Sequence, residues 1–185
     1  MVSCGSFHTL ALDLDGNVWS FGLNNDGQLG IGQYYDRFIY PKQVDIGERC
    51  KYISCGGNSS YVIDINDNIW VFGNNSNGQL RSRKGLISTT GIEILNETDR
   101  YIYIPTLMES LLLPTIKSIS CGYNYAILSD INEKIWGLGG NDEKQLGIKT
   151  EEVSTYIPIE IKLDDVHKIK KIACGYSHTI VLADY

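Results

Sequence analysis

The sequence lacks several features that would point to whole classes of protein. No apolar run approaches the roughly 20 residues that a membrane-spanning helix needs, and the first residues lack the basic start and apolar stretch of a secretory signal. The five cysteines form no C-x-x-C pair, which argues against a disulfide framework and a zinc site. We therefore expect an intracellular protein, cytoplasmic or nuclear, whose cysteines are small buried apolar residues.

The chain also lacks an excess of basic residues. It has 16 Lys and Arg against 22 Asp and Glu, a net charge of -6 and a pI near 5.0. A nucleic-acid-binding face needs a basic footprint, so no direct contact with nucleic acid is expected. The sequence also contains no Gly-rich phosphate loop, zinc-ligand spacing or ordered catalytic triad. We expect no enzymatic activity, no cofactor and no metal.

What the sequence does contain is an internal repeat. Ser-Cys-Gly or Ala-Cys-Gly occurs four times. In each of the first three copies a Trp follows the motif cysteine by 15 positions, and a Gln-Leu pair follows it by 24. The cysteines of successive motifs lie 51, 66 and 53 residues apart. The repeated positions, which we expect to serve the fold, are Cys4, Gly5, Trp19, Gly22, Gln28, Cys55, Gly56, Trp70, Gly73, Gln79, Cys121, Gly122, Trp136, Gly139, Gln145, Cys174 and Gly175.

These spacings divide one domain, residues 1–185, into repeats. The boundaries fall at about 1–50, 51–116 and 117–169, with a partial fourth repeat at 170–185. The second repeat is longer than the others, and its extra length lies in an insertion at 82–104.

Hydrophobicity alternates with a period of two inside each repeat, as in His8–Leu12 and Val18–Phe21. The Asp15-Gly16 pair between these runs predicts a hairpin with a type I′ turn, and Glu133 is a poor residue for the equivalent turn. A third strand is predicted to start at each recurring proline, and a fourth to run into the next Cys-Gly. Four short strands in about 50 residues indicate an all-β protein built from β-propeller blades. The recurring prolines are Pro41, Pro105 and Pro158.

The motifs can be compared with a known repeat. Cys-Gly-x-x-His-Thr-Leu-Ala-Leu, then Asp-Gly-x-Val-Trp-Ser-Phe-Gly, then Asn-x-x-Gly-Gln-Leu-Gly resembles the repeat of the regulator of chromosome condensation family. Departures occur at Arg81 and Lys144, where the first repeat has glycine, and at Leu138, where it has an aromatic residue. The resemblance implies a β-propeller with four-stranded antiparallel blades.

Rings of this family have seven blades, which at this repeat length would need roughly 350 residues. The 185 residues therefore predict an incomplete ring of three to four blades. The chain could be a fragment of a longer propeller, or two copies or a partner chain could complete the ring. A third alternative pairs Val2–Leu12 with Lys171–Leu182 in a shared blade.

Structural roles are expected for the other recurring side chains. The tryptophan rings should pack between neighbouring blades while their N–H groups find partners. Asp13, Asp64 and Asp130 recur before the hairpin turns, and a turn role is favoured over metal binding. His8 and His178 share one repeat position, and each is interpreted as a structural histidine.

Function is expected where the repeats differ. The candidate interaction loop contains Arg81, Arg83, Lys84, Arg100, Tyr101 and Tyr103, with a tolerated surface loop as the alternative. We predict a protein–protein interaction scaffold or adaptor, and the resemblance implies partners such as small GTPases, chromatin proteins or ubiquitin-ligase components. One alternative is a guanine nucleotide exchange factor for a Ran-like GTPase, with the insertion as its projecting wedge. Another is a degenerate or fragmentary repeat protein without activity.

Overall fold

A computed structural model describes residues 1–32, 36–80, 100–108, 113–163 and 168–184. These residues contain no α-helix, and so no helix that could cross a membrane. The prediction of an all-β protein is confirmed. The strands are β1 (Val2–Cys4), β2 (His8–Leu12), β3 (Val18–Leu23), β4 (Arg37–Val44), β5 (Cys50–Cys55), β6 (Ser59–Asp64), β7 (Ile69–Asn74), β8 (Tyr101–Leu107), β9 (Ile116–Cys121), β10 (Tyr125–Asp130), β11 (Ile135–Gly140), β12 (Ser154–Ile161), β13 (Lys168–Cys174) and β14 (Thr179–Asp184).

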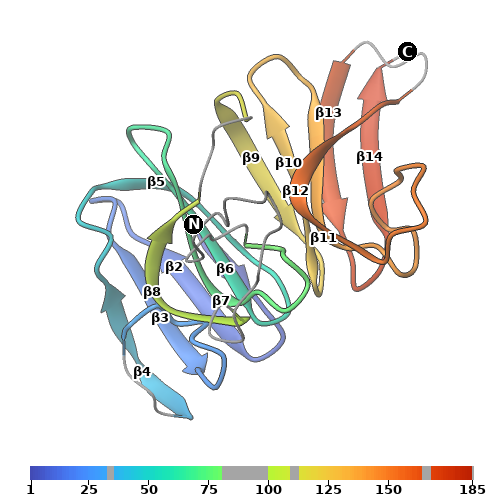
Figure 1. Cartoon of the computed structure of the whole chain (residues 1–185). Helices are drawn as coiled ribbons and strands as arrows, with labels where there is room; N and C mark the ends of the chain where they lie inside the picture. Colours follow the sequence, from blue (N-terminus) through green and yellow to red (C-terminus); the bar gives the residue numbers. More distant parts are fainter. Residues whose placement is uncertain (33–35, 81–99, 109–112, 164–167, 185) are drawn as a thin grey trace, which may run out of the picture.

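The strands form successive blades of a partial propeller. Blade 1 is β1-β2-β3-β4, blade 2 is β5-β6-β7-β8, blade 3 is β9-β10-β11-β12, and blade 4 is the hairpin β13-β14. All neighbouring strands are antiparallel, and the sheets follow one another along an open arc (Figure 1). The expected partial ring of three to four blades is confirmed.

The proposed shared blade, in contrast, is wrong. Val2–Leu12 forms β1 and β2 of blade 1, whereas Lys171–Leu182 belongs to the separate blade 4. The two ends of the chain lie well apart in Figure 1. The end strands therefore do not pair within one chain.

The core lies between the blades. All six residues of β6 and all six of β10 are buried, because blades 2 and 3 each have a neighbour on both faces. One apolar cluster spans blades 1 to 3 and includes Leu10, Phe72 and Leu128. A smaller cluster joins blade 3 to Ile172 and Val181 of blade 4. Each sheet thus buries its faces on its neighbours, as stacked repeats do.

The recurring prolines lie inside the outer strands and do not start them, so that prediction was wrong. Pro41 lies within β4, and the pairing of β3 with β4 skips three residues between Lys42 and Phe38. The same irregularity occurs around Pro105 and Pro158. Proline has no N–H for the ladder and is tolerated at a bulge of an edge strand.

The predicted type I′ turn at Asp15-Gly16 was also wrong. Gly16 donates its N–H to the Asp13 carbonyl at 3.3 Å, and in this turn only Gly16 has a positive φ, of 86°. This is a type I turn followed by a left-handed residue, the common alternative in hairpins. The other blades use the same turn, with Asp67 at φ 68° and Glu133 at φ 64°.

The recurring aspartates organise these turns, as expected. One carboxylate oxygen of Asp13 accepts the N–H groups of Asp15 at 3.0 Å and Asn17 at 2.8 Å, and the other accepts the Trp19 indole N–H at 3.0 Å. The hydrogen bond from Trp19, followed by those from Asn17, lowers the pKa of Asp13 to about 2. The same bonds recur at Asp64 and Asp130.

Trp70 and Trp136 are partly buried and pack against the cluster that spans blades 1 to 3. Their N–H groups, however, bond within their own blade, to Asp64 and Asp130. Each tryptophan therefore ties the hairpin turn to the packed face of its sheet.

We predict that Glu133→Gly stabilises the protein by about 1 kcal/mol. The left-handed conformation costs a residue with a side chain roughly 1–2 kcal/mol, and glycine removes this cost. Part of the gain is offset because glycine has a larger conformational entropy in the unfolded chain. Asp15→Gly is the matched control, since Asp15 has no positive φ and the change should lose about 0.5–1 kcal/mol. Urea unfolding measures both. A loss of stability in Glu133→Gly comparable to that in Asp15→Gly would show that the turn is not strained.

Candidate interaction surfaces

The inner ends of the four blades meet at the turns that follow the Cys-Gly pairs. Ser6 donates its N–H to the Gly57 carbonyl at 2.9 Å, Gly57 to Tyr123 at 3.0 Å, and Tyr123 to Tyr176 at 3.1 Å. This axial ladder joins each blade to the next through backbone alone. A Cβ on Gly56 would lie 2.8 Å from the Gly122 carbonyl oxygen, so the second residue of the pair must be small.

These turns line a shallow, open hollow of about 230 Å³, the axial cup, formed by the four Cys-Gly pairs with Ser6, Gly57, Tyr123 and Tyr176. The Tyr123 and Tyr176 rings stack with centroids 4.3 Å apart, and Tyr176 remains 67% exposed. Sequence reasoning missed this pair because the position holds Ser and Gly in the first two repeats.

Of the cysteines at the cup, Cys55 is buried and Cys121 and Cys174 are partly buried, whereas Cys4 is exposed, so the expectation of buried cysteines was wrong for Cys4. The Cys55 thiol donates to the Ser3 carbonyl of blade 1 at 3.3 Å, and Cys174 donates in the same way to Ser120 of blade 3. Burial raises the pKa of Cys55 to about 12 and raises that of Cys121 as well. Among the described residues, no group of three or more His, Cys, Asp or Glu side chains could hold a metal ion.

His8 and Ser60 form the one close His–Ser contact that the described part of the chain provides, and it is structural. Nε2 of His8 lies 2.9 Å from Oγ of Ser60, which donates its own proton to the Gln28 carbonyl at 2.7 Å. His8 is 3% exposed, and its Nδ1 has no carboxylate to orient it. Burial lowers the pKa of His8 to about 4. The pair bridges blades 1 and 2 and lacks the orienting acid of a catalytic site.

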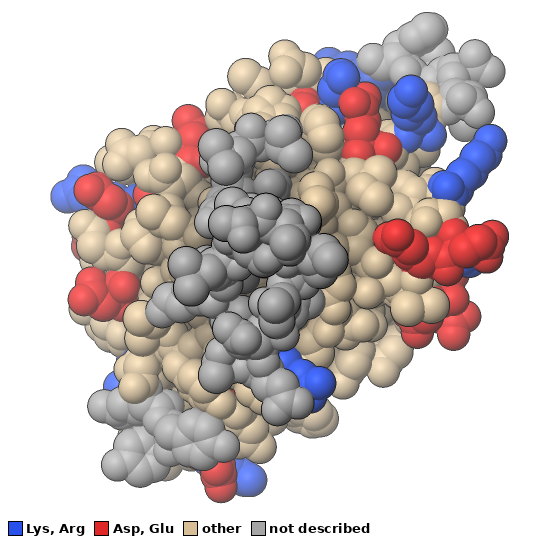
Figure 2. All heavy atoms as spheres, viewed as in Figure 1, with Lys and Arg blue, Asp and Glu red and all other residues tan. Residues whose placement is uncertain are grey.

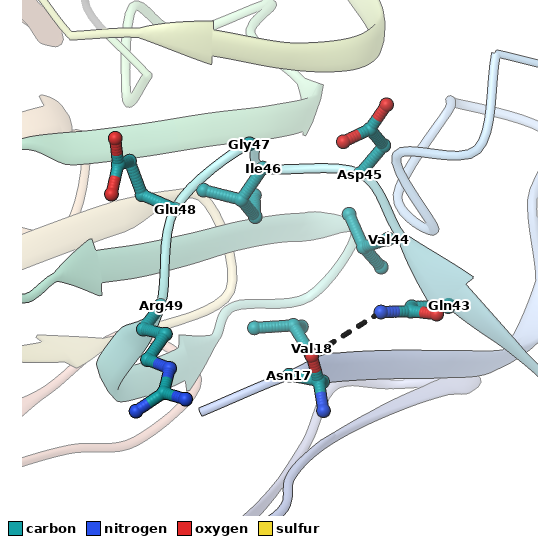
Figure 3. A pocket seen from close by; sticks show the side chains of 9 residues that line it. All are labelled: Asn17, Val18, Gln43, Val44, Asp45, Ile46, Gly47, Glu48 and Arg49. Carbon is teal, nitrogen blue, oxygen red and sulfur yellow. Dashed lines mark hydrogen bonds between the residues drawn. The ribbon is translucent and has the colours of Figure 1, made fainter. Parts of the chain in front are cut away.

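A larger hollow, of about 540 Å³, lies where blade 1 passes into blade 2 (Figure 3). Val18, Val44 and Ile46 form its buried apolar floor, and the polar rim includes Asp45 and Arg49. Gln43 donates to Asn17 at 3.3 Å across one side. The side chains that line the hollow form no recognisable catalytic set.

The candidate interaction loop is only partly described. Arg81, Arg83 and Lys84 lie outside the described residues. Tyr101 and Tyr103 belong to β8, so residues 101–104, which we placed in the insertion, form the first half of the outer strand of blade 2. Arg100 is exposed just before it.

Tyr103 and Tyr101 have different surroundings. Tyr103 packs on blade 1, where its carbonyl accepts the Gly32 N–H at 2.9 Å and its backbone leaves no room for a Cβ at Gly27. Tyr101 is 40% exposed. Farther along β8, Ile104 and Leu107 are 51% and 48% exposed, two residues that sequence reasoning did not select. The stretch from Arg100 to Leu107 is called the β8 rim below.

Charged side chains are unevenly distributed on the face shown in Figure 2. Acidic side chains gather over the loop between β11 and β12, which contains the exposed Asp142, Glu143, Glu151 and Glu152. Lys168, Lys170 and Lys171 are exposed on blade 4. The Lys170 ammonium forms an ion pair with Asp184 on the neighbouring strand. Three lysines on one edge strand do not make the broad basic surface that phosphate neutralisation requires.

Antiparallel four-stranded sheets that follow one another about an axis define a β-propeller, and comparison with known proteins identifies its kind. The sequence profile of the regulator of chromosome condensation (RCC1) repeat matches residues 15–63 and 132–182, and a second RCC1 profile matches residues 50–79. The chain belongs to the RCC1 repeat family.

Individual relatives agree with this assignment. The chain is 30% identical to the Protein RCC2 homolog of Xenopus laevis over 88% of its length, and 28% identical to the ultraviolet-B receptor UVR8 of Arabidopsis thaliana over 97%. These matches cover 34% and 38% of the relatives, so the chain spans little more than a third of either. Prp20p of Saccharomyces cerevisiae, whose structure was described with its binding properties to Gsp1p and histones, superposes with a TM-score of 0.84 at 20% identity, over 99% of this chain and 43% of Prp20p.

We predict that the buried His8 makes stability fall as the pH drops from 6.5 to 4. Unfolded histidine titrates near 6.5, whereas the folded His8 has a pKa of about 4, so only the unfolded chain takes up a proton in this range. The contribution is full above pH 6.5 and is lost as the pH falls toward 4. At 1.36 kcal/mol for each pH unit, it amounts to at most about 3 kcal/mol.

Urea unfolding across this pH range provides the measurement. His8→Gln keeps an N–H for Ser60 and does not titrate, so it should lose less stability than the native chain between pH 6.5 and 4. Carboxylates titrate in both proteins and drop out of the difference. Parallel pH profiles for the two proteins would contradict the prediction.

Proposed function

We propose that the chain is a protein-interaction scaffold and that the β8 rim is its principal contact surface. The main support is that Tyr101, Ile104 and Leu107 are exposed along one outer strand, which follows the exposed Arg100. Tyr and Arg are enriched among the residues that dominate binding energy at protein interfaces.

The strand itself is suited to this task. β8 is the outer strand of its sheet and pairs only with β7 among the described strands. Pro105 removes one backbone donor from this edge, which disfavours non-specific pairing with other strands. We therefore assign recognition of the partner to the side chains of the β8 rim and not to its backbone. The net charge of -6 favours a protein partner over nucleic acid.

The relatives support the same class of function. RCC1-type propellers include Prp20p, whose structure was described with its binding to Gsp1p and histones. Small GTPases, chromatin proteins and ubiquitin-ligase components are the partner classes to test first. We place the protein inside the cell, in the cytoplasm or nucleus, where its five free thiols would stay reduced.

Photocrosslinking tests the proposal. A photoreactive phenylalanine analogue in place of Tyr101 should cross-link to a protein in an extract of the native cells, which mass spectrometry then identifies. The same analogue in place of Leu14 is the matched control, because Leu14 is fully exposed on a turn between β2 and β3.

The affinity of the purified partner then measures the contribution of the rim. We expect Arg100→Ala with Tyr101→Ala to raise the Kd by roughly 10- to 100-fold, as hot-spot truncations of about 1–3 kcal/mol do. Leu14→Ala should leave the Kd unchanged. An unchanged Kd for the double variant would overturn the assignment of the β8 rim.

A further inference from the structure

Three buried polar atoms lack a hydrogen-bond partner within the described part of the chain, and all of them lie where blade 1 meets blade 2. They are Nδ1 of His8, Nε2 of Gln28 and Oδ1 of Asn58. His8 bonds the Ser60 hydroxyl, which donates to the Gln28 carbonyl. The Gln28 side chain in turn accepts the Asp26 N–H at 2.9 Å. Buried polar groups are nearly always paired, so three open ones in a single network call for a physical explanation.

This network contains a carboxylate that is open on one side. Oδ2 of Asp26, in the turn after β3, accepts amide N–H groups of blade 2, from Asn58 at 2.9 Å and from Asn74 at 3.0 Å. Oδ1 accepts no hydrogen bond from a described residue and does not belong to the buried unpaired atoms, so solvent reaches it. No described basic side chain forms an ion pair with Asp26.

The orientation of the Asn58 amide shows that the junction is arranged around this carboxylate. Asn58 directs its N–H to Asp26 and leaves its own Oδ1 buried without a donor. An unpaired amide oxygen costs free energy, whereas a hydrogen bond to a carboxylate is stronger than one between neutral groups. The two amides therefore fix the Asp26 carboxylate before any ligand binds.

The other described junctions lack this combination. Asn77 and Glu143 hold the place of Asp26 in blades 2 and 3, where the backbone N–H of each bonds the Gln side chain of its own turn in the same way. Asn77 has no charge. Glu143 has a carboxylate, but Ser177 of blade 4, at the repeat position of Asn58, has no amide to donate to it. The site at Asp26 is thus a departure from the repeat.

The site adjoins the β8 rim. Asn74, which donates to Asp26, pairs with Tyr101 across β7 and β8. Gly27, the next residue after Asp26, lies against the same strand, because a Cβ there would be 2.7 Å from the Ile102 carbonyl oxygen. A protein seated on Tyr101 would therefore lie beside the open oxygen of Asp26.

We propose that Asp26 binds a basic side chain, Arg or Lys, of the protein that docks on the β8 rim. The inference rests on the proposed function and adds the charge of one contact residue of the partner. The cationic group would donate to Oδ1 while Oδ2 keeps its bonds from Asn58 and Asn74. Because the amides already hold the carboxylate, binding orders one side chain fewer. The net charge of -6 also attracts a basic partner.

A small ligand tests the site without the partner. N-acetyl-arginine amide is titrated into the isotope-labelled chain at low salt, where exposed charges are screened least. NMR follows the side-chain NH2 signals of Asn58 and Asn74, and we expect these signals to shift and to reach saturation. N-acetyl-citrulline amide has nearly the same shape without the charge, so it is the matched ligand and should cause no saturable shift.

Two variants locate the binding. Asp26→Asn keeps an oxygen for both amides and removes the charge, so it should weaken arginine binding roughly tenfold or more. Glu143→Gln removes the equivalent carboxylate of blade 3 and should leave the binding unchanged. The purified rim partner should respond in the same way, with a Kd raised roughly tenfold by Asp26→Asn and not by Glu143→Gln.

Equal shifts with the arginine and citrulline ligands, or shifts that persist in Asp26→Asn, would overturn the inference and leave water as the occupant of the site. Its failure differs from failure of the proposed function. If Arg100→Ala with Tyr101→Ala weakens partner binding and Asp26→Asn does not, the rim stands and the basic contact is wrong. If only Asp26→Asn weakens partner binding, the basic contact stands and the assignment of the rim is wrong.

Discussion

The fold depends on contact between blades near the axis. A single blade of four short strands has two apolar faces and no core of its own, so its stability comes from its neighbours. The axial ladder provides this contact through backbone groups. It requires glycine after Cys4 and Cys55, where a Cβ would meet the carbonyl oxygen of the next blade at 2.6 Å and 2.8 Å, whereas after Cys121 and Cys174 a Cβ would collide with the Tyr125 and His178 rings. Other side chains can vary as long as this close approach is kept.

Much of this architecture could be predicted from spacing alone. The fixed intervals from Cys to Trp to Gln marked the repeats, and the β-type runs such as His8–Leu12, the hairpin signal and the recurring prolines together indicated four strands in each. Turn type and strand ends were harder, since they depend on local hydrogen bonding. Asp13 sets the turn through its carboxylate, and the strand continues past Pro41 because the outer edge tolerates a bulge. The rim residues Ile104 and Leu107 were missed because apolar side chains within a strand suggest burial, whereas their exposure is decided by how the neighbouring blades pack.

The departures from the repeat have physical causes that only the assembled blades show. Gly27 and Gly78 both have φ of 78°, and a Cβ at either would meet Tyr103 or Tyr156 in the outer strand of the following blade at 2.9 Å or less. Lys144 occupies the same position at φ 58°, and its ammonium folds back onto the Thr150 carbonyl at 2.9 Å. This hydrogen bond ties the Lys144 side chain to its own loop between β11 and β12.

The same reasoning connects the architecture to binding. A sheet face that is buried at one junction can bind another surface wherever its neighbour is absent, because its apolar area is unchanged. Blade 1 and blade 4 expose such faces at the ends of the arc, while the β8 rim exposes apolar side chains on an edge that the propeller does not cover. The end faces are built from repeated residues and favour further copies of the repeat. Within the β8 rim, Arg100, Tyr101 and Leu107 differ from their counterparts in blades 1 and 3, and this difference favours a partner unrelated to the repeat.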